Sequence, residues 1–318
     1  MKYYLGMDIG GTKCAVVLSE KSADSVKDKI RFETKSERGW QAVVDELISS
    51  SAELLERNGV LSEDVIACGV SCGGPLNSET GVIMRPPNLP DWDNVPLADI
   101  VKERLGICCK VQNDADACAL AEWQFGAGKG TKNMIFLTFG TGMGAGLILN
   151  GKLYTGTCGT AGEVGHIRLD ADGPVAYGKA GSFEGFCSGA GIAAMTKKML
   201  SIYNGTTSIP KDNINAATVA QAAAGGDRLA QAIYRRCGEK LGLGLSILID
   251  ILNPEMIVIG SIFQRSGRLL VESMNEVLKK EALSVSAECC KIVPAFLGDN
   301  IGDFAALGVA RNFAEGEK

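Results

Sequence analysis

Two glycine-rich turns constrain the fold more than any other feature of this sequence. The first is DIGGTK at residues 8–13, and the second is TFGTGMGAG at residues 138–146. Each turn lies between two short apolar segments, a pattern typical of a strand, a tight turn and a returning antiparallel strand. The pattern begins each half of a 318-residue chain, and that length suggests about two domains. We therefore expect a duplicated α/β unit with a cleft between the two copies.

The segments between these turns predict alternating helices and strands. Apolar residues at helical spacing predict helices over 39–59, 113–126, 227–254 and 302–314, and apolar runs predict strands over 65–74, 108–112, 134–140, 147–150 and 254–263. We expect an N-terminal domain of residues 1–117 closed by 297–318, and a C-terminal domain of residues 118–296.

Composition excludes several classes of function. The net charge is −5 and no cluster of Lys and Arg stands out, which argues against a nucleic-acid surface. No apolar run is long enough for a membrane span, and the start MKYYLGMDIGG lacks a signal-peptide pattern. The eleven cysteines occur singly or as adjacent pairs, mostly in apolar contexts, as expected of thiols in a reducing compartment. We expect a cytoplasmic protein with no membrane or nucleic-acid partner.

Both glycine turns have the chemistry of phosphate cradles. Glycines let backbone N–H groups approach an anion, and Thr12, Lys13 and Thr141 add hydroxyl and ammonium donors. Neither turn contains the GxxxxGK[ST] string of a mononucleotide P-loop, and the second lacks the GxGxxG register of a dinucleotide turn. The sequence therefore disfavours a P-loop NTPase and a dinucleotide-binding dehydrogenase, while a small phosphate-bearing ligand remains expected.

Two aspartates accompany these turns. Asp114 lies where a strand meets a helix, so Asn113 or Asp114 could be only a helix N-cap. A carboxylate there could also accept a proton from a substrate hydroxyl, because the helix N-terminus favours its ionised form. Asp8, in the first turn, would suit Mg²⁺ near the phosphates, directly or through water.

A hydrolase is the main competing hypothesis from the residues alone. GVSCG at residues 69–73 matches the G-x-S-x-G nucleophile elbow, and Ser71, Asp114 and His166 follow the chain order of a hydrolase triad. The elbow requires a helix directly after the serine. Here GGPLNSETG supplies turn residues instead, which disfavours a serine hydrolase.

Six motifs together resemble the ROK family, named for repressors, open reading frames and kinases. They are DIGGTK, SCGGPLNSETGVIMRPPNLPDW, QNDADACALAE, LTFGTGMGAGLILNGKLYTG, GEVGHI and LNPEMIVIG, in this order and over essentially the whole chain. The resemblance implies two ribonuclease-H-like domains of the actin and hexokinase type, with ATP bound between them. It also implies transfer of the ATP γ-phosphoryl group to a hydroxyl of a hexose or N-acetylhexosamine, with homodimers frequent.

The resemblance implies a role for each matching residue. Asp114 matches the catalytic base, and Asp8 matches a Mg²⁺ element. The residues that match sugar ligands are Gly73, Gly74, Asn88, Asn113, Glu163, His166 and Glu184. The residues that match the nucleotide and phosphate elements are Asp8, Gly10, Gly11, Thr12, Lys13, Thr141, Gly142 and Gly260. Ser261 stands where the family usually has the second glycine of a pair, so the adenosine contact differs here.

The chain departs from the family at its structural zinc site. Most members hold Zn²⁺ with the GHI histidine and three cysteines, but Val175, Tyr177 and Ser182 stand where those cysteines would be. None of the three supplies a thiolate, so we expect no zinc. A replacement set of Cys158, Cys187 and His166 has no spacing known for such a site. As an alternative, packing of Tyr177, Phe183 and Phe186 as an apolar cluster would order the loop.

Two alternatives to a kinase remain within the family. Its repressors carry an N-terminal helix-turn-helix extension, whereas the first glycine turn starts here at residue 8, which favours a kinase. A catalytically degenerate sugar-binding member is the second alternative, weakened by the intact Asp114 and both turns. The sequence does not select the sugar or the hydroxyl.

Overall fold

The computed structural model describes residues 1–316 and divides them into two compact units. Unit 1 comprises Met1–Gly130, Thr155–Gly159 and the residues from Asp299 onward, and unit 2 comprises Thr131–Tyr154 and Thr160–Gly298. We expected the first boundary at residue 117, which would cut the helix α3 (Asp114–Phe125). That helix stays in unit 1 because it packs against α11 (Ile301–Gly316).

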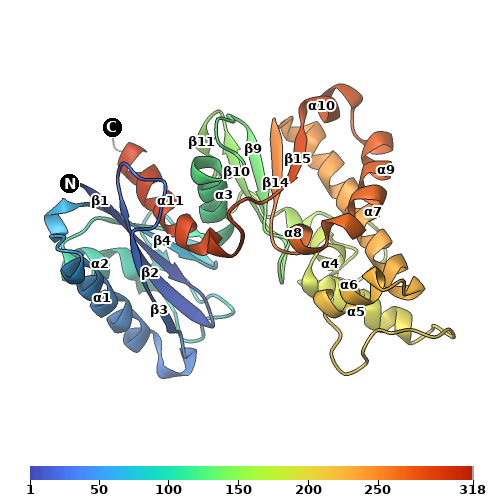
Figure 1. Ribbon diagram of the computed structural model, residues 1–318, viewed down its shortest axis with the longest axis horizontal. Helices are drawn as coiled ribbons and strands as arrows, with labels where there is room; N and C mark the ends of the chain where they lie inside the picture. Colours follow the sequence, from blue (N-terminus) through green and yellow to red (C-terminus); the bar gives the residue numbers. More distant parts are fainter. Residues whose placement is uncertain (317–318) are drawn as a thin grey trace. The chain divides into compact units, whose positions relative to one another are not determined.

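Unit 1 is built on a five-stranded mixed sheet (Figure 1). Its strands, in spatial order, are β3 (Asp28–Glu33), β2 (Lys13–Glu20), β1 (Tyr3–Ile9), β4 (Val65–Cys72) and β8 (Cys109–Asn113). The strands β1 and β2 pair antiparallel, as the first glycine turn predicted, and β1, β4 and β8 are parallel neighbours. The helices of unit 1 are α1 (Trp40–Arg57), α2 (Leu97–Leu105), α3 and α11.

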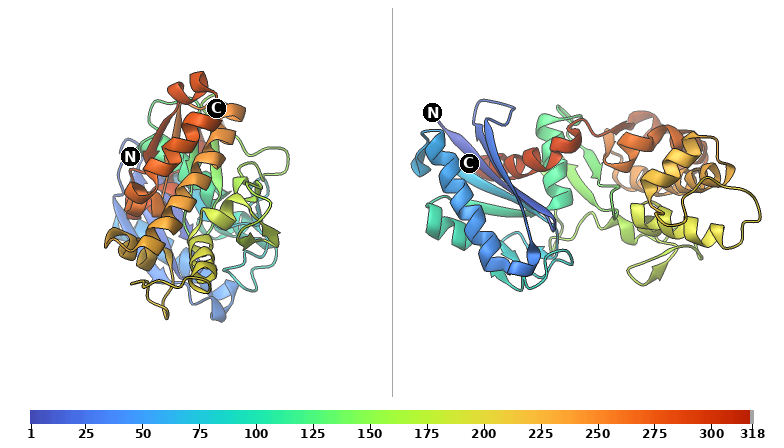
Figure 2. Two further views of the ribbon diagram at one scale, coloured as in Figure 1. Left: turned by 90° about the vertical axis from the view of Figure 1, so that its right-hand side faces the viewer. Right: turned by 60° about the horizontal axis from the view of Figure 1, so that its bottom comes forward.

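The alternation of side chains along β1 separates the two faces of this sheet. Leu5 and Met7 are fully buried in the cluster that contains the apolar face of α1. Tyr4 belongs to the cluster of α11, and Gly6 lies against Ala306 of α11. Because successive side chains of a strand point to opposite faces, Asp8 follows Tyr4 and Gly6 toward α11. Helices α1 and α11 thus cover opposite faces of the sheet (Figure 2).

Unit 2 repeats the same sheet. Its strands, in spatial order, are β11 (Lys152–Leu153), β10 (Ala145–Leu149), β9 (Met134–Leu137), β14 (Met256–Ile259) and β15 (Lys291–Pro294). Again the first strand pairs antiparallel with the next one along the chain and parallel with a later one. The predicted duplication of an α/β unit is therefore confirmed.

The core of unit 2 forms around its longest helix. This helix, α7 (Arg228–Leu252), lies within the stretch that the sequence predicts to be the longest helix, and it packs against α4, α5, α6 and α9. The other helices of the unit are α4 (Phe183–Phe186), α5 (Gly189–Leu200), α6 (Ala216–Ala224), α8 (Ile262–Ser266), α9 (Val271–Glu281) and α10 (Ser284–Cys289).

Two small sheets and several single turns complete the fold. One sheet, formed by β5 (Leu76–Asn77), β6 (Val82–Ile83) and β7 (Val95–Pro96), follows β4 in unit 1. The other is a hairpin of β12 (Val175–Ala176) and β13 (Lys179–Ala180) in unit 2. The 3₁₀ turns are η1 (Ser36–Arg38), η2 (Ser62–Asp64), η3 (Val164–His166), η4 (Gly267–Leu269) and η5 (Gly298–Asn300). Across residues 1–316, no helix combines the length and the apolar character that a membrane span requires.

The contact of α11 with the sheet depends on glycine. A Cβ added at Gly69 of β4 would overlap the backbone of Ala306 and Ala310, so the helix could not lie where it does. Forcing extra atoms into such a contact shifts the backbone. We predict that Gly69→Ala lowers the free energy of unfolding of unit 1 by about 1–3 kcal/mol, measured by urea denaturation.

Gly267→Ala is the matched control for this prediction. Gly267 has helical dihedral angles, and a Cβ there would make only ordinary contacts of 3.7 Å or more with Phe263. The free energy of unfolding of Gly267→Ala should equal or exceed that of the parent. Equal losses in the two variants would show that the close approach of α11 is not the cause.

Candidate active site

The first glycine turn joins β1 to β2 and is held by its own backbone. The Gly10 N–H donates to the carbonyl of Lys13 (3.1 Å), and the Thr34 hydroxyl donates to the carbonyl of Gly10 (2.6 Å). Thr12 and Lys13 are exposed at the end of the turn. The turn is therefore rigid while its predicted donors face outward.

Several predicted ligands of unit 1 meet beside this turn. A Cβ at Gly11 would lie 2.6 Å from the carbonyl oxygen of Asn88. A Cβ at Gly73 would lie 3.6 Å from the Asn88 side-chain oxygen, and one at Gly74 would lie 3.2 Å from the Asn113 side-chain nitrogen. The structure thus brings together residues from four separate places in the sequence of unit 1.

Asn113 and Asp114 lie where β8 ends and α3 begins. The Asn113 side chain caps the helix by accepting from the Ala115 N–H (2.9 Å), and Asp114 Oδ1 accepts from the same group (2.8 Å). The N-cap interpretation is thus confirmed for Asn113. Asp114 is nevertheless exposed, so its carboxylate can meet a ligand from solvent.

Asp8 is a partly buried carboxylate with two other aspartates near it, Asp303 and Asp114. Burial raises its pKa to about 6, and the charges of Asp303 and Asp114 act in the same direction. Asp303 itself is buried and pairs with Lys29 (2.8 Å). The start of α11 lies directly against Asp8, because a Cβ added at Gly302 would overlap the Asp8 carboxylate. Hard oxygen donors with excess negative charge suit Mg²⁺.

Ser71 is not placed as a hydrolase nucleophile. It lies inside β4, pairs in register with Asp8, and is 2 % exposed. The strand leads through Gly73 and Gly74 into the short strand β5 rather than into a helix. The elbow geometry that the G-x-S-x-G reaction needs is absent from this segment, so the serine hydrolase alternative is wrong.

The second glycine turn joins β9 to β10 in unit 2 and contacts Glu184. The Gly140 N–H donates to the carbonyl of Gly142 (3.0 Å), and Glu184 Oε2 accepts from the Met143 N–H (2.9 Å). A Cβ at Gly142 would lie 2.7 Å from the same carboxylate oxygen. The predicted phosphate turn and a predicted sugar ligand therefore share one hydrogen-bonded cluster, with Thr141 exposed.

Glu163 precedes the turn η3 and His166 is its last residue, next to that cluster. Added Cβ atoms at Gly162 and Gly165 would overlap the carbonyls of Ala145 and Met143, so only glycine lets this segment lie against β10 and the turn. Both Glu163 and His166 are exposed. Within unit 2, the three predicted sugar ligands Glu163, His166 and Glu184 therefore lie on adjoining segments, because η3 contacts α4.

Gly260 and Ser261 follow β14 and adjoin the second turn. The Gly260 N–H extends the sheet by donating to the carbonyl of Leu137 (2.9 Å). Ser261 has φ of 51°, in the region that favours glycine. A Cβ at Gly140 would lie 3.7 Å from the Ser261 hydroxyl oxygen. Ser261 therefore adopts a backbone conformation that glycine reaches more easily than serine.

The three positions that lack a cysteine serve other purposes. Ser182 caps α4, because its hydroxyl accepts from the Gly185 N–H (3.1 Å), whereas Val175 and Tyr177 are exposed on the hairpin β12–β13. The proposed cluster of Tyr177, Phe183 and Phe186 is wrong: the two phenylalanines are buried in the core of unit 2, but Tyr177 stacks on His166. A tyrosine hydroxyl is costly to bury, and the hairpin places this side chain at its tip.

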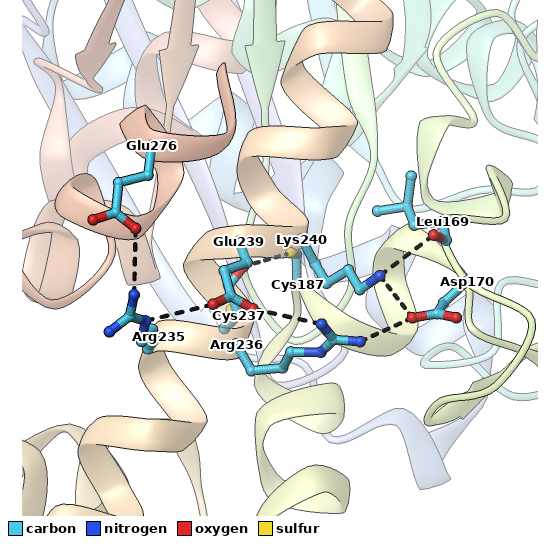
Figure 3. A network of polar contacts seen from close by, with 9 residues as sticks. All are labelled: Leu169, Asp170, Cys187, Arg235, Arg236, Cys237, Glu239, Lys240 and Glu276. Atoms are coloured by element: carbon cyan, nitrogen blue, oxygen red, sulfur yellow. Dashed lines mark hydrogen bonds and ion pairs between the residues drawn. The ribbon is translucent and has the colours of Figure 1, made fainter. Parts of the chain in front are cut away.

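A buried lysine of α7, which the sequence analysis missed, holds the segment that follows η3 (Figure 3). Lys240 is 7 % exposed, and its ammonium group contacts Asp170 (2.8 Å) and lies 5.1 Å from the ring centroid of Phe186. Arg236 also pairs with Asp170 (2.8 Å). The hydrogen bond from Lys240 lowers the pKa of Asp170 below its usual value. A lysine on the buried stripe of α7 was the available signal, because a buried ammonium group requires a partner.

The described residues contain no candidate zinc site. In residues 1–316, no three His, Cys, Asp or Glu side chains gather as metal ligands, and the structure does not bring Cys158, Cys187 and His166 together as such a group. All eleven cysteines are free thiols, and Cys187 is buried in the core of unit 2. The absence of bound zinc stays a prediction that elemental analysis of the purified protein would test.

Comparison with known proteins supports what the geometry suggests. The model of the ROK family matches residues 4–312 of this chain. The chain belongs to the ROK family. A ROK family glucokinase from Streptomyces griseus, solved in complex with glucose and AMPPNP, is 29 % identical, with a TM-score of 0.75 over 97 % of this chain and 99 % of that one. The two-domain fold of the actin and hexokinase type is thereby confirmed.

Relatives in the ROK family include both enzymes and regulators. A glucokinase from Thermotoga maritima is 29 % identical over 312 residues, which cover 96 % of each chain. A xylose repressor from Caldicellulosiruptor bescii is 29 % identical over 303 residues, which cover 93 % of this chain and 74 % of the repressor. Overall identity therefore does not separate a kinase from a regulator.

The raised pKa of Asp8 predicts a pH-dependent cost to stability. Between its ordinary value of 3.8 and about 6, the folded state retains a proton that the unfolded state has lost. Above pH 6 the folded state carries the full cost of the charge, about 3 kcal/mol at 1.36 kcal/mol per pKa unit. Asp8→Asn should therefore raise the free energy of unfolding at pH 8 by up to about 3 kcal/mol.

Urea denaturation of the parent and of Asp8→Asn at pH 8 and pH 4.5 measures this effect. The gain should shrink at the lower pH, where the aspartate is mostly protonated in the folded state. A gain that is equal or larger at pH 4.5 would contradict the assignment. Magnesium should be absent from both series, because a bound cation would offset the charge.

Proposed function

We propose that this chain is an ATP-dependent sugar kinase that phosphorylates a hydroxyl of a hexose or N-acetylhexosamine. The observation that carries the proposal is an exposed carboxylate, Asp114, at the N-terminus of α3. It lies close enough to Asp8, beside the first glycine turn, for the two charges to interact. Membership of the ROK family and the similar glucokinases support the same activity.

In the proposed reaction, Asp114 acts as the general base. The sugar hydroxyl oxygen forms a bond to the γ-phosphorus of ATP while the bond from that phosphorus to the β–γ bridging oxygen breaks. The hydroxyl proton passes to Asp114, and ADP leaves. Because phosphoryl transfer has a loose transition state, the protein mainly positions the reactants and offsets charge, and the proton moves late.

Backbone donors and one carboxylate are proposed to serve the phosphates. Gly10, Gly11, Thr12 and Lys13 of the first turn and Thr141 and Gly142 of the second would face them, and Gly260 would border the adenosine. Asp8 would hold Mg²⁺, directly or through water, with Asp303 and Asp114 adding to the negative potential there. The cation supplies charge neutralisation to the phosphate oxygens.

Sugar binding is proposed to rest on two groups of residues. In unit 1 these are Gly73, Gly74, Asn88 and Asn113, and in unit 2 they are Glu163, His166 and Glu184. Carboxylates and imidazole fix the direction of a hydroxyl hydrogen bond, so the sugar can be oriented without a metal. Glu184 is preorganised for this purpose, because the Met143 N–H already fixes one of its oxygens.

A sugar-binding protein without catalysis is the second candidate function. The observation that favours it is the sequence identity of 29 % to the xylose repressor, the same as that to the glucokinase from Thermotoga maritima. Substrate screening separates the two candidates. We would measure ADP release with glucose, mannose, fructose, allose and their N-acetylated and amino relatives. A kinase gives turnover with at least one sugar, whereas a binding protein gives sugar affinity without turnover.

Substitution of the proposed base gives the sharpest single prediction. Asp114→Asn should lower kcat by about 10²-fold or more, because the hydroxyl loses its proton acceptor, while sugar affinity stays close to that of the parent. Steady-state kinetics measure the first quantity, and calorimetric titration of the sugar measures the second.

Asp116→Asn is the matched control, since it makes the same chemical change two residues later in α3. Asp116 is buried and accepts a hydrogen bond from Gln112 (2.7 Å), so the variant should lose stability but keep its turnover. Normal turnover in Asp114→Asn would remove Asp114 from the mechanism. A comparable loss of turnover in both variants would indicate disruption of the helix rather than loss of a base.

A further inference from the structure

The hairpin β12–β13 has an unusual residue at its tip. Val175 pairs with Ala180 and Ala176 pairs with Lys179, which leaves a two-residue loop. Both loop residues, Tyr177 and Gly178, have positive φ values of 49° and 70°. This is the pattern of a type I′ turn, in which Asn, Asp or Gly is strongly preferred at the first position.

The tyrosine at this position gains little from burial. A non-glycine residue in the left-handed region is strained, and a bulky side chain is more strained there than Asn. Tyr177 is 73 % exposed, so burial in the core does not offset that strain. The ring contact that it makes is with His166, at 5.0 Å between ring centroids and 30° between ring planes.

The same hairpin holds His166 at a second point. Lys179, two residues beyond Tyr177, donates from its ammonium group to the main-chain carbonyl of His166 (2.7 Å). The lysine thus fixes the backbone of His166, and the tyrosine ring restricts the rotation of its imidazole. Rotation about the last side-chain bond of histidine is otherwise broad, so an exposed imidazole needs such a contact to keep one plane.

The base of the hairpin is itself fixed to the segment that carries His166. Arg168 donates to the carbonyl of Ala180 (2.9 Å), and the Leu169 N–H donates to the carbonyl of Gly181 (2.8 Å). Asp170, next in the chain, pairs with the buried Lys240 of α7. These contacts hold the base of the hairpin in place, and they thereby fix the position of its tip, which carries Tyr177.

We propose that Tyr177 and Lys179 are positioning residues that fix the plane of the His166 imidazole for recognition of one sugar hydroxyl. The proposal rests on the proposed function, in which His166 binds the sugar. A hydrogen bond weakens steeply when its angle is poor, so an imidazole held in one plane binds a hydroxyl better than a rotating one. The hairpin turn itself does not require a tyrosine at this position. The ring serves instead to hold the plane of the His166 imidazole.

His166 is the only histidine of the chain, which gives a clean spectroscopic test. In protein labelled at histidine, the imidazole C–H signals report the ring current of Tyr177. Tyr177→Asn suits the type I′ turn better than tyrosine does, so it removes the ring without weakening the hairpin. These signals should move downfield in Tyr177→Asn and stay close to the parent positions in Tyr177→Phe.

Sugar recognition should follow the same pattern. In Tyr177→Asn the KM for glucose, or for the sugar of the panel with the fastest turnover, should rise about three- to tenfold, while kcat stays close to the parent value. Tyr177→Phe should restore the parent KM, and Lys179→Met should show part of the loss. Val175→Ala, at an exposed position on the same hairpin, is the matched control and should change neither quantity.

Each result supports or overturns one statement. Unchanged histidine signals in Tyr177→Asn would show that the stack does not exist, and shifted signals with an unchanged KM would show that the stack does not position His166 for the sugar. Titration of the sugar against the histidine signals gives its dissociation constant without turnover. A weakened affinity in Tyr177→Asn, together with no turnover in the parent, would contradict the kinase proposal but support the positioning role. Absence of both binding and turnover with every sugar would overturn both proposals.

Discussion

The contact between α11 and the glycine-bearing face of β1 and β4 is the constraint on which unit 1 depends. Gly6 and Gly69 let the last helix of the chain lie directly on strands formed near its beginning. The same contact brings Gly302 against the carboxylate of Asp8, whose pKa is raised first by burial and then by the charge of Asp303. The packing of α11 on the sheet therefore also influences the electrostatics of the proposed cation site.

Duplication of the unit explains why the proposed site residues occur in two groups. Each sheet begins with a hairpin whose glycine turn exposes hydroxyl or ammonium donors, Thr12 and Lys13 in one unit and Thr141 in the other. Each turn is then contacted by a later segment, through Asn88 in unit 1 and Glu184 in unit 2. The two copies have thus diverged in their loops while keeping one sheet topology, as is common where function resides in loops on a rigid scaffold.

Sequence patterns predicted the parts of the fold that depend on interactions between residues close together in the chain. The two hairpins follow from apolar alternation around glycines, and α7 follows from a long apolar stripe with a 3.6-residue period. The first boundary between the units did not follow, because it depends on the packing of α3 against α11, residues far apart in the sequence. The orientations of Tyr177 and Lys240 were missed for the same reason, since a turn conformation and a buried ion pair are set by tertiary contacts. The positions of the site residues within each unit are now known, whereas their roles are proposals.

The transfer of labelled phosphate tests the central claim most directly. The protein would be incubated with Mg²⁺, ATP carrying ³²P in its γ-phosphoryl group, and the sugar that gives the fastest turnover. The account predicts that the label appears in a sugar phosphate in an amount equal to the ADP formed, and that Asp114→Asn abolishes most of this transfer. Label released only as inorganic phosphate, or ATP left intact with every sugar, would contradict it.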